Sequence, residues 1–165
     1  GMLSFIDDYR KLTKVAKPRL ESVAISHFFE SIQSLLKGEM DKAGIQFNVD
    51  IKEVDSILLD AALVEQVLIN LIKNSTHAVE GVEQPSIELN AYNEGKRTII
   101  EVKDNGQGIG EKELREIFVP FFSTKKNGSG IGLSLSKQIM HLHGGQIKVK
   151  SEVGKGTSFN LVFKG

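Results

Sequence analysis

Hydrophobic residues recur at helical spacing in four segments of the chain. The most regular segment follows Asp60, where Leu63, Val67 and Leu71 lie on one broad arc of a helix that ends near Gly81. The other helices are predicted over residues 2–17, 27–42 and 131–142.

Three features mark the ends and faces of these helices. Pro18 should end the first helix, because proline disfavours helical geometry in the residue before it. Ser26 can cap the second helix, with Glu30 near the capping-box position. The first helix carries a narrow apolar stripe, which is typical of a helix that packs against a partner helix. The stripe is formed by Phe5, Tyr9, Leu12 and Ala16.

Alternating apolar residues predict the strands. Residues 45–51 alternate clearly, and residues 22–26 and 56–59 are shorter candidates. Two hairpins are expected, one over residues 86–93 and 97–104 and one over residues 146–152 and 157–164. Residues 105–130 are expected to be loop. This order favours an α+β sandwich with one sheet covered by helices on one face.

Composition narrows the function classes. The 165 residues suit one domain, and 40% hydrophobic residues suffice for a packed core. Basic and acidic residues number 21 each, so there is no strongly basic footprint and no nucleic-acid partner is expected. The absence of cysteine excludes disulfides and thiolate sites. No apolar run is long enough to span a membrane.

The helix after Asp60 carries two asparagines on one face. Asn70, Asn74 and His77 lie along one border of its apolar arc. Asparagine is a poor helix former, so this pair needs a reason. The residues could be a polar border that makes hydrogen bonds, or neutral oxygen ligands that suit Mg²⁺.

A carboxylate is expected to point inward at the end of the strand over residues 97–104. Ile100, Val102 and Asp104 share the face opposite Glu101 and Lys103. A buried carboxylate needs a donor, and the exocyclic amine of adenine would serve. The alternative is that Asp104 merely opens a turn at Asn105-Gly106.

A glycine run leads into the last helix, with the sequence Gly128-Ser129-Gly130-Ile131-Gly132-Leu133. Backbone N–H groups at a helix N-terminus can bind phosphate, but the run is neither a Rossmann fingerprint nor a P-loop. A phenylalanine-rich segment over residues 118–122 precedes it, followed by Lys125 and Lys126. The lysines could face terminal phosphates or simply be solvated.

In this order, the features resemble the ATP-binding catalytic domain of bacterial sensor histidine kinases, over about residues 20–164. The N, G1, F, G2 and G3 boxes of that family are matched, in this order, by residues 70–74, 104–108, 118–122, 128–132 and 154–157. The resemblance implies a two-layer α/β sandwich of the Bergerat type, with helices on one face of a mixed, mostly antiparallel sheet. It also implies ATP and Mg²⁺ as cofactors, and a lid over residues 110–130.

The resemblance implies roles for individual residues. Asn74 would be the Mg²⁺ ligand, Asn70 its phosphate-side companion, and Lys125 a cation near the terminal phosphates. Asp104 would recognise adenine. The remaining nucleotide-binding positions are expected to be Gly106, Gly108, Ile109, Gly128, Ser129, Gly130, Ile131, Gly132, Leu133 and Thr157.

The phosphoacceptor histidine of the family is not matched in this sequence. His27, His77, His141 and His143 lack its sequence context and are expected to be surface or core residues. Residues 1–18 are expected to comprise a cloning remnant, Gly1-Met2, and the tail of a truncated dimerisation helix. Residues 19–165 would be the ATP-binding domain.

The resemblance also implies partners. The γ-phosphoryl group of ATP would pass to a histidine-bearing dimerisation domain of the parent kinase, and a response regulator would act downstream. The parent is expected to be a cytoplasmic homodimer, with or without a membrane anchor. The fragment itself is expected to be a monomer or weak dimer.

Three other functions fit the same fold. ATPases of the type II topoisomerase, mismatch-repair or heat-shock kind place a glutamate one helical turn before the Mg²⁺-binding asparagine. Asn70 stands there and cannot act as a base, which favours a kinase. A protein serine kinase or phosphatase partner is disfavoured by the dimerisation-helix tail. A regulatory nucleotide-binding module would usually lose Asp104 or Asn74, and both are present.

Overall fold

Five strands form the main sheet of the structure, a computed structural model in which residues 16–120 and 132–164 are described. They are β2 (Gln46–Ile51), β4 (Ser86–Glu94), β5 (Arg97–Asp104), β6 (Gln146–Glu152) and β7 (Gly156–Lys164). Their spatial order is β2-β4-β5-β7-β6. Only β2 and β4 run parallel within this sheet, and the other neighbours are antiparallel. The predicted α+β class is confirmed.

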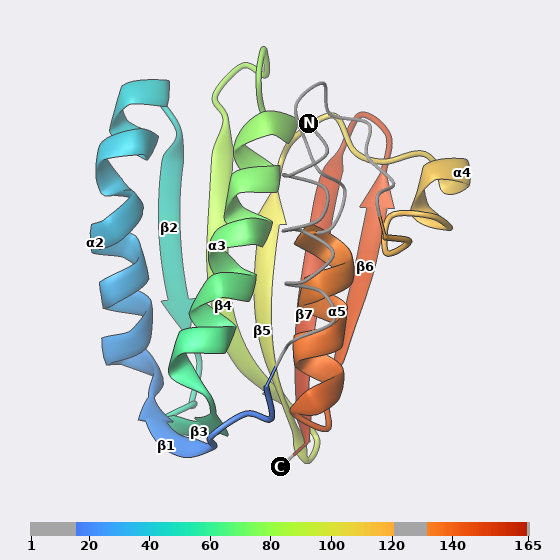
Figure 1. The fold of residues 1–165 in the computed structure, drawn as a ribbon. Helices are drawn as coiled ribbons and strands as arrows, with labels where there is room; N and C mark the ends of the chain where they lie inside the picture. The colour runs from blue at the N-terminus through green and yellow to red at the C-terminus, as the bar shows by residue number, and fades with distance from the viewer. Residues whose placement is uncertain (1–15, 121–131, 165) are drawn as a thin grey trace, which may run out of the picture.

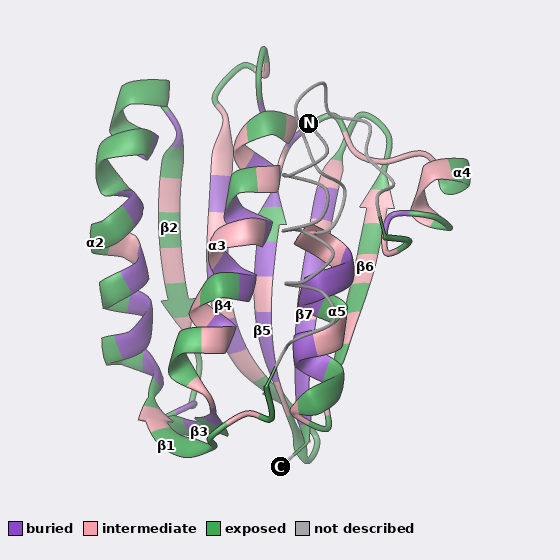
Figure 2. Ribbon diagram, viewed as in Figure 1, coloured by how far each residue is buried: buried purple, intermediate pink, exposed green. Residues whose placement is uncertain are grey.

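Three long helices cover one face of this sheet (Figure 1). They are α2 (Ile25–Ala43), α3 (Ala61–Ala78) and α5 (Gly132–Leu142). Helix α3 lies in the middle and packs against both of the others. Buried residues gather between the helices and the sheet (Figure 2), where alternate residues of β4, such as Ile87 and Leu89, are fully buried. This layer is the hydrophobic core.

A second, two-stranded sheet lies beside the main one. It pairs β1 (Glu21–Ala24) with β3 (Ser56–Leu59) in antiparallel register. The sequence predicted both strands but not this separate pairing. The predicted cap at Ser26 is wrong, because α2 begins at Ile25 with Ala24 as its N-cap residue and no side-chain cap. The N–H of Ile25 instead donates to the Asp55 carbonyl at 3.0 Å.

Two further predictions changed. Residues 16–20 form neither helix nor strand, so the first predicted helix does not reach Lys17, and its residues 2–15 lie outside the described residues. The predicted loop over residues 105–130 contains a one-turn helix, α4 (Glu111–Leu114). In the described parts of the chain, no helix combines the length and apolar character needed to cross a membrane.

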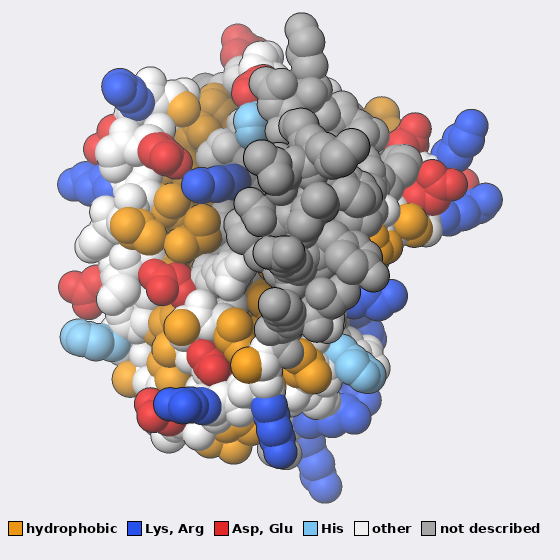
Figure 3. Space-filling model, viewed as in Figure 1, with side chains coloured by type: hydrophobic (Ala, Val, Ile, Leu, Met, Phe, Trp, Pro, Cys, Tyr) orange, Lys and Arg blue, Asp and Glu red, His pale blue; other side chains and the backbone are white. Residues whose placement is uncertain are grey.

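The surface around the helices carries both signs of charge. In Figure 3, lysine and arginine side chains are interspersed with aspartate and glutamate over the part of the face formed by α2 and α3. This mixture agrees with the formal net charge of zero.

Candidate functional site

Helix α3 places the two asparagines beside the core. Asp60 begins the helix, since its Oδ1 accepts the Leu63 N–H at 3.1 Å and so satisfies a donor of the first turn. The apolar arc of α3 is buried against the sheet, which leaves Asn70 and Asn74 half-buried at its border. The side-chain oxygens of both residues are therefore candidates for binding a ligand.

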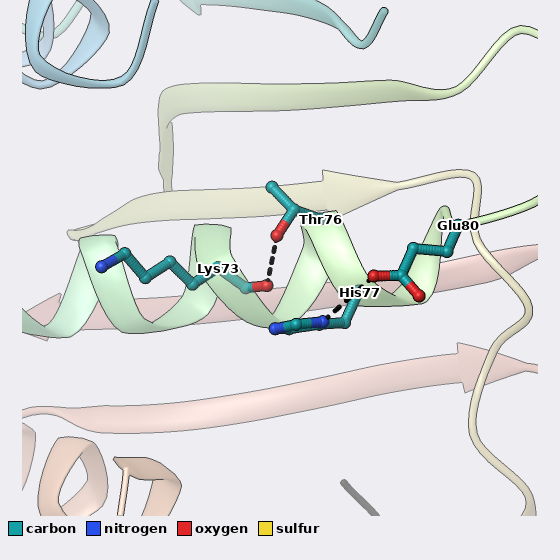
Figure 4. A network of polar contacts seen from close by, with 4 residues as sticks. All are labelled: Lys73, Thr76, His77 and Glu80. Carbon is teal, nitrogen blue, oxygen red and sulfur yellow. Dashed lines mark hydrogen bonds and ion pairs between the residues drawn. The ribbon is translucent and has the colours of Figure 1, made fainter. Parts of the chain in front are cut away.

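His77 does not share the half-buried position of the two asparagines. It is exposed in the last turn of α3, and its Nδ1 lies 3.3 Å from Oε1 of Glu80, which follows the helix (Figure 4). The adjacent residue, Thr76, donates its hydroxyl to the Lys73 carbonyl one turn earlier at 2.7 Å. Of the three polar residues that the sequence places along this border, the two asparagines are therefore half-buried and the histidine is on the surface.

Asp104 points inward at the end of β5, as predicted. It pairs in register with Ile87 of β4 and Thr157 of β7 and is 5% exposed. Its Oδ1 accepts the Gly106 N–H at 2.9 Å. Burial raises the pKa of Asp104, and contacts from Gly106, Ser75 and Thr157 only partly offset this.

No lysine, arginine or histidine among the described residues forms an ion pair with Asp104. A carboxylate desolvated in this way gains from any ligand that brings N–H donors to it. The turn interpretation is also correct in part, because the chain does turn at Gly106 through the hydrogen bond to Asp104.

The glycines after Asp104 are needed for contacts within the protein. A Cβ at Gly106 would lie 2.5 Å from the Ala78 carbonyl oxygen at the end of α3. A Cβ at Gly108, whose φ is +78°, would lie 2.2 Å from the carbonyl oxygen of Glu152. These glycines let the loop pass between α3 and the β6–β7 turn, which fixes the backbone next to Asp104.

Ser151 joins this loop to the β6–β7 turn, and the sequence prediction missed it. Its hydroxyl accepts the Ile109 N–H at 2.7 Å, donates to the Gly156 carbonyl at 3.0 Å and lies 2.7 Å from Thr157 Oγ1. A signal was available, because Ser151 follows Val149 in the inward register of β6, where an apolar residue is expected. Thr157, predicted as a nucleotide-binding residue, is buried in this contact.

The start of α5 meets α3 at Asn70. A Cβ at Gly132 would lie 2.4 Å from Asn70 Oδ1. The Asn70 amide also lies 3.5 Å from the Ser136 hydroxyl, which itself donates to the Gly132 carbonyl at 2.9 Å. The structure therefore brings together Asn70 and Gly132, two residues that the sequence placed in different motifs.

Part of the predicted site lies outside the described residues. This part comprises Lys125, Gly128, Ser129, Gly130 and Ile131, together with Phe121 and Phe122 of the expected lid. Of the neighbouring residues, Leu133 is half-buried against the core, and Phe118 is half-buried with the Lys137 ammonium 5.6 Å from its ring centroid.

The four histidines match the expectation of surface or core residues. His27, His77 and His141 are exposed. His143 is half-buried, with Nδ1 2.8 Å from the Ile139 carbonyl, and its Nε2 accepts the Asp60 N–H at 3.1 Å. The bond to Asp60 holds the end of α5 against the start of α3.

The protein groups around Asn74 fit a magnesium ion only if the ligand supplies further oxygens. The described residues contain no group of three or more His, Cys, Asp or Glu side chains that could hold a metal. Asn74 offers a neutral carbonyl oxygen, which Mg²⁺ accepts when substrate phosphates and water complete its octahedron. A metal at Asn74 would therefore bind together with a phosphate ligand.

The site thus combines a buried carboxylate at the end of β5, two half-buried asparagines on α3 and a glycine loop packed against the end of α3. The chain belongs to the family of histidine kinase-, DNA gyrase B- and HSP90-like ATPases, whose model matches residues 59–165. Within that family it is a histidine kinase ATP-binding catalytic domain.

Its relatives and structural neighbours agree. The sensor histidine kinase ZraS of Salmonella typhimurium (strain LT2) is 35% identical over 94% of this chain and 34% of its own length, so the chain spans about a third of that relative. The solved catalytic domain of histidine kinase ThkA is similar with a TM-score of 0.77 and 27% identity, covering 88% of this chain and 95% of that one. Full-length ShkA, solved with AMPPNP, shares the fold with a TM-score of 0.84 and 23% identity, over 98% of this chain and 35% of its own.

Proposed function

We propose that this chain binds Mg·ATP and transfers the γ-phosphoryl group to a histidine on a separate dimerisation domain of its parent kinase. The observation that carries the proposal is Asp104, a carboxylate buried at the inward end of β5 without a cationic partner among the described residues. The 6-amino group of adenine can donate a hydrogen bond to this carboxylate.

The other residues of the site would bind the metal, the phosphates and the base. Asn74 would supply a Mg²⁺ ligand, and Asn70, held against Gly132, would contact the phosphate side. The fixed loop through Gly106 and Gly108 would keep the nucleotide base against Asp104. Lys125 and the G2 residues Gly128, Ser129, Gly130 and Ile131 remain proposals from the family resemblance.

The transfer requires positioning and charge neutralisation more than acid–base chemistry. An imidazole nitrogen of the acceptor attacks the γ-phosphorus, a P–N bond forms, and the bond to the bridging oxygen breaks as ADP leaves. Mg²⁺ when bound neutralises charge on the β- and γ-phosphates. Since imidazole is itself the nucleophile, this domain needs no strong base.

ATP hydrolysis is the second candidate function, and Asn70 argues against it. A carboxylate at this position could orient an attacking water, whereas an amide cannot take its proton. The half-buried Asn70 side chain is held against Gly132 and near Ser136. Slow hydrolysis relative to phosphotransfer is therefore expected.

We also propose the partners that this activity needs. The acceptor is the histidine of a dimerisation domain of the parent kinase, and the parent would be a homodimer. A response regulator would receive the phosphoryl group next. Because ATP and such a regulator are cytoplasmic, the domain would act in the cytoplasm.

The test is phosphotransfer between separate domains. The chain is mixed with γ-labelled ATP and the dimerisation domain of its parent, and acid-labile phosphate is followed on both. Label should accumulate slowly on the dimerisation domain, because the domains are no longer tethered at high effective concentration. Label on His27, His77, His141 or His143 of this chain would contradict the proposal.

A further inference from the structure

A histidine just beyond α5 uses both of its ring nitrogens. The Nδ1 of His143 lies 2.8 Å from the Ile139 carbonyl oxygen, which can only accept, so Nδ1 carries the proton. Nε2 is then the acceptor of the ring, and it takes the Asp60 N–H at 3.1 Å. The ring also stands edge-on to Phe163 of β7, with 6.3 Å between the ring centroids. These three contacts hold the imidazole in one tautomer and one orientation.

The residue that His143 contacts organises the start of α3. Asp60 is the N-cap residue of this helix, and its Oδ1 accepts the Leu63 N–H at 3.1 Å. Its Oδ2 accepts the Arg19 N–H at 2.9 Å, and this bond is the largest cause of the lowered pKa of Asp60. The carboxylate thus joins two segments of the chain, and the Asp60 backbone N–H joins a third segment through the His143 ring.

The Asp60–His143 bond lies at one end of a helix pair whose other end is at the candidate site. Helices α3 and α5 lie side by side and run in opposite directions (Figure 1). Gly132 at the start of α5 meets the Asn70 amide, where a Cβ would stand 2.4 Å from Oδ1. Since α5 has 11 residues and is about 16 Å long, its two contacts with α3 lie roughly three turns apart.

The hydrogen bond at the far end constrains a motion that apolar packing constrains only weakly. Buried apolar residues line the inward side of α5, but burial of apolar surface has no directional preference. The Asp60–His143 bond is directional and fixes where α5 stands along α3. Because the fit between Gly132 and Asn70 leaves no room for a methyl group, a small slide of α5 must move the Asn70 side chain.

We propose that His143 is a positioning residue for nucleotide binding: its bond to the Asp60 N–H keeps α5 in place along α3, so that the Asn70 amide faces the phosphate side of ATP. This rests on the proposed function, in which Asn70 contacts the phosphate side. The adenine end of that site is at Asp104 on β5, outside this helix pair. Loss of the His143 bond should therefore weaken binding of the phosphates and spare binding of the base.

The test compares two ligands in a matched pair of variants. His143→Asn and His143→Gln both lose the ring, but only glutamine is long enough to return an acceptor to the Asp60 N–H. His141→Asn, on the exposed side of the last turn of α5, is the control. Each variant is titrated with Mg·ATP and with adenosine, which lacks phosphates.

His143→Asn should bind Mg·ATP about three- to tenfold more weakly than the parent chain and bind adenosine equally well. His143→Gln should recover most of the loss, and His141→Asn should bind both ligands as the parent does. If His143→Asn does not fold, His143→Leu takes its place, because it also lacks an acceptor but fills the space beside Phe163.

A measurement on the nucleotide-free chain completes the test. The NMR signals of the Asn70 side-chain amide should shift in His143→Asn and stay unchanged in His141→Asn, since only the first variant releases α5. Unmoved Asn70 signals, an equal loss for both ligands, or no recovery in His143→Gln would mean that the His143 bond serves stability alone, and would overturn the proposal. Failure of the parent chain itself to bind Mg·ATP would instead overturn the proposed function and this inference with it.

Discussion

The first residue of α5, Gly132, lies directly against the side-chain amide of Asn70, such that a Cβ at Gly132 would stand 2.4 Å from Asn70 Oδ1. The contact joins the helix that carries the asparagines to the helix that follows the G2 glycine run. The orientation of Asn70 is thereby tied to the presence of glycine at this position.

Gly132→Ala should therefore weaken Mg·ATP binding, on the order of tenfold, because the methyl group must displace the Asn70 amide. Helix propensity alone would favour alanine. Gly38→Ala in α2 is the matched control, since a Cβ there meets nothing within 4 Å. It should raise stability by roughly 0.5–1 kcal/mol and leave affinity unchanged. Equal affinities for both variants would show that the Asn70 contact is not needed.

Two glycines with left-handed backbone separate steric contact from backbone strain. Gly108 and Gly154 have φ of +78° and +83°, but only Gly108 lacks space for a Cβ. Gly108→Ala should lower the free energy of unfolding by roughly 1–3 kcal/mol more than Gly154→Ala, because it pushes the loop off Glu152. Urea denaturation measures the difference. Similar losses would mean that the loop can move away from the β6–β7 turn without penalty.

The raised pKa of Asp104 predicts that ionisation of this carboxyl group lowers the stability of the folded chain as pH rises. A carboxyl group whose pKa is higher in the folded than in the unfolded chain contributes stability at low pH that is lost as pH rises through its folded pKa. Asp104→Asn keeps an oxygen for the Gly106 N–H but cannot ionise. Its stability advantage over the parent chain should appear as pH rises above 3.8 and then level off. Urea unfolding over a pH series measures this advantage, and an advantage independent of pH would contradict the burial argument.

Removal of Mg²⁺ should distinguish the two ends of the site. Asn74→Ala and Asp104→Ala should each weaken Mg·ATP binding by roughly ten- to a hundredfold. Without metal, Asn74→Ala should bind ATP nearly as well as the parent chain does, whereas Asp104→Ala should stay impaired because adenine recognition needs no metal. Calorimetry in EDTA makes the comparison. The same metal dependence for both variants would return Asn74 to the role of a polar helix border.

Periodicity predicted most of this fold because it reports burial. The arc of α3 and the alternation of β4 both place apolar residues toward one core, and the structure keeps them there. The predicted start of α2 was wrong. The local sequence suggested a cap at Ser26, but the helix begins at Ile25, whose N–H bonds to Asp55, thirty positions away along the chain. Such contacts leave no mark in local sequence.

The site was predictable only where residue chemistry conflicts with position. Asp104 stood out because a carboxylate occupies an inward strand position. Ser75 and Ser151 carry the same kind of signal more weakly, as hydroxyls at apolar positions, and neither was recognised. The glycines were predicted to admit a ligand, whereas at Gly106 and Gly108 their first requirement is close approach of protein backbone, which only the assembled fold reveals.

The measurement that tests the central claim most directly is calorimetric titration of the chain with ATP and with GTP, each with and without Mg²⁺. One ATP site is predicted, tighter with Mg²⁺, and GTP should bind at least about tenfold more weakly because its carbonyl oxygen would face the Asp104 carboxylate. Equal affinity for the two nucleotides, or no binding of ATP, would contradict the account.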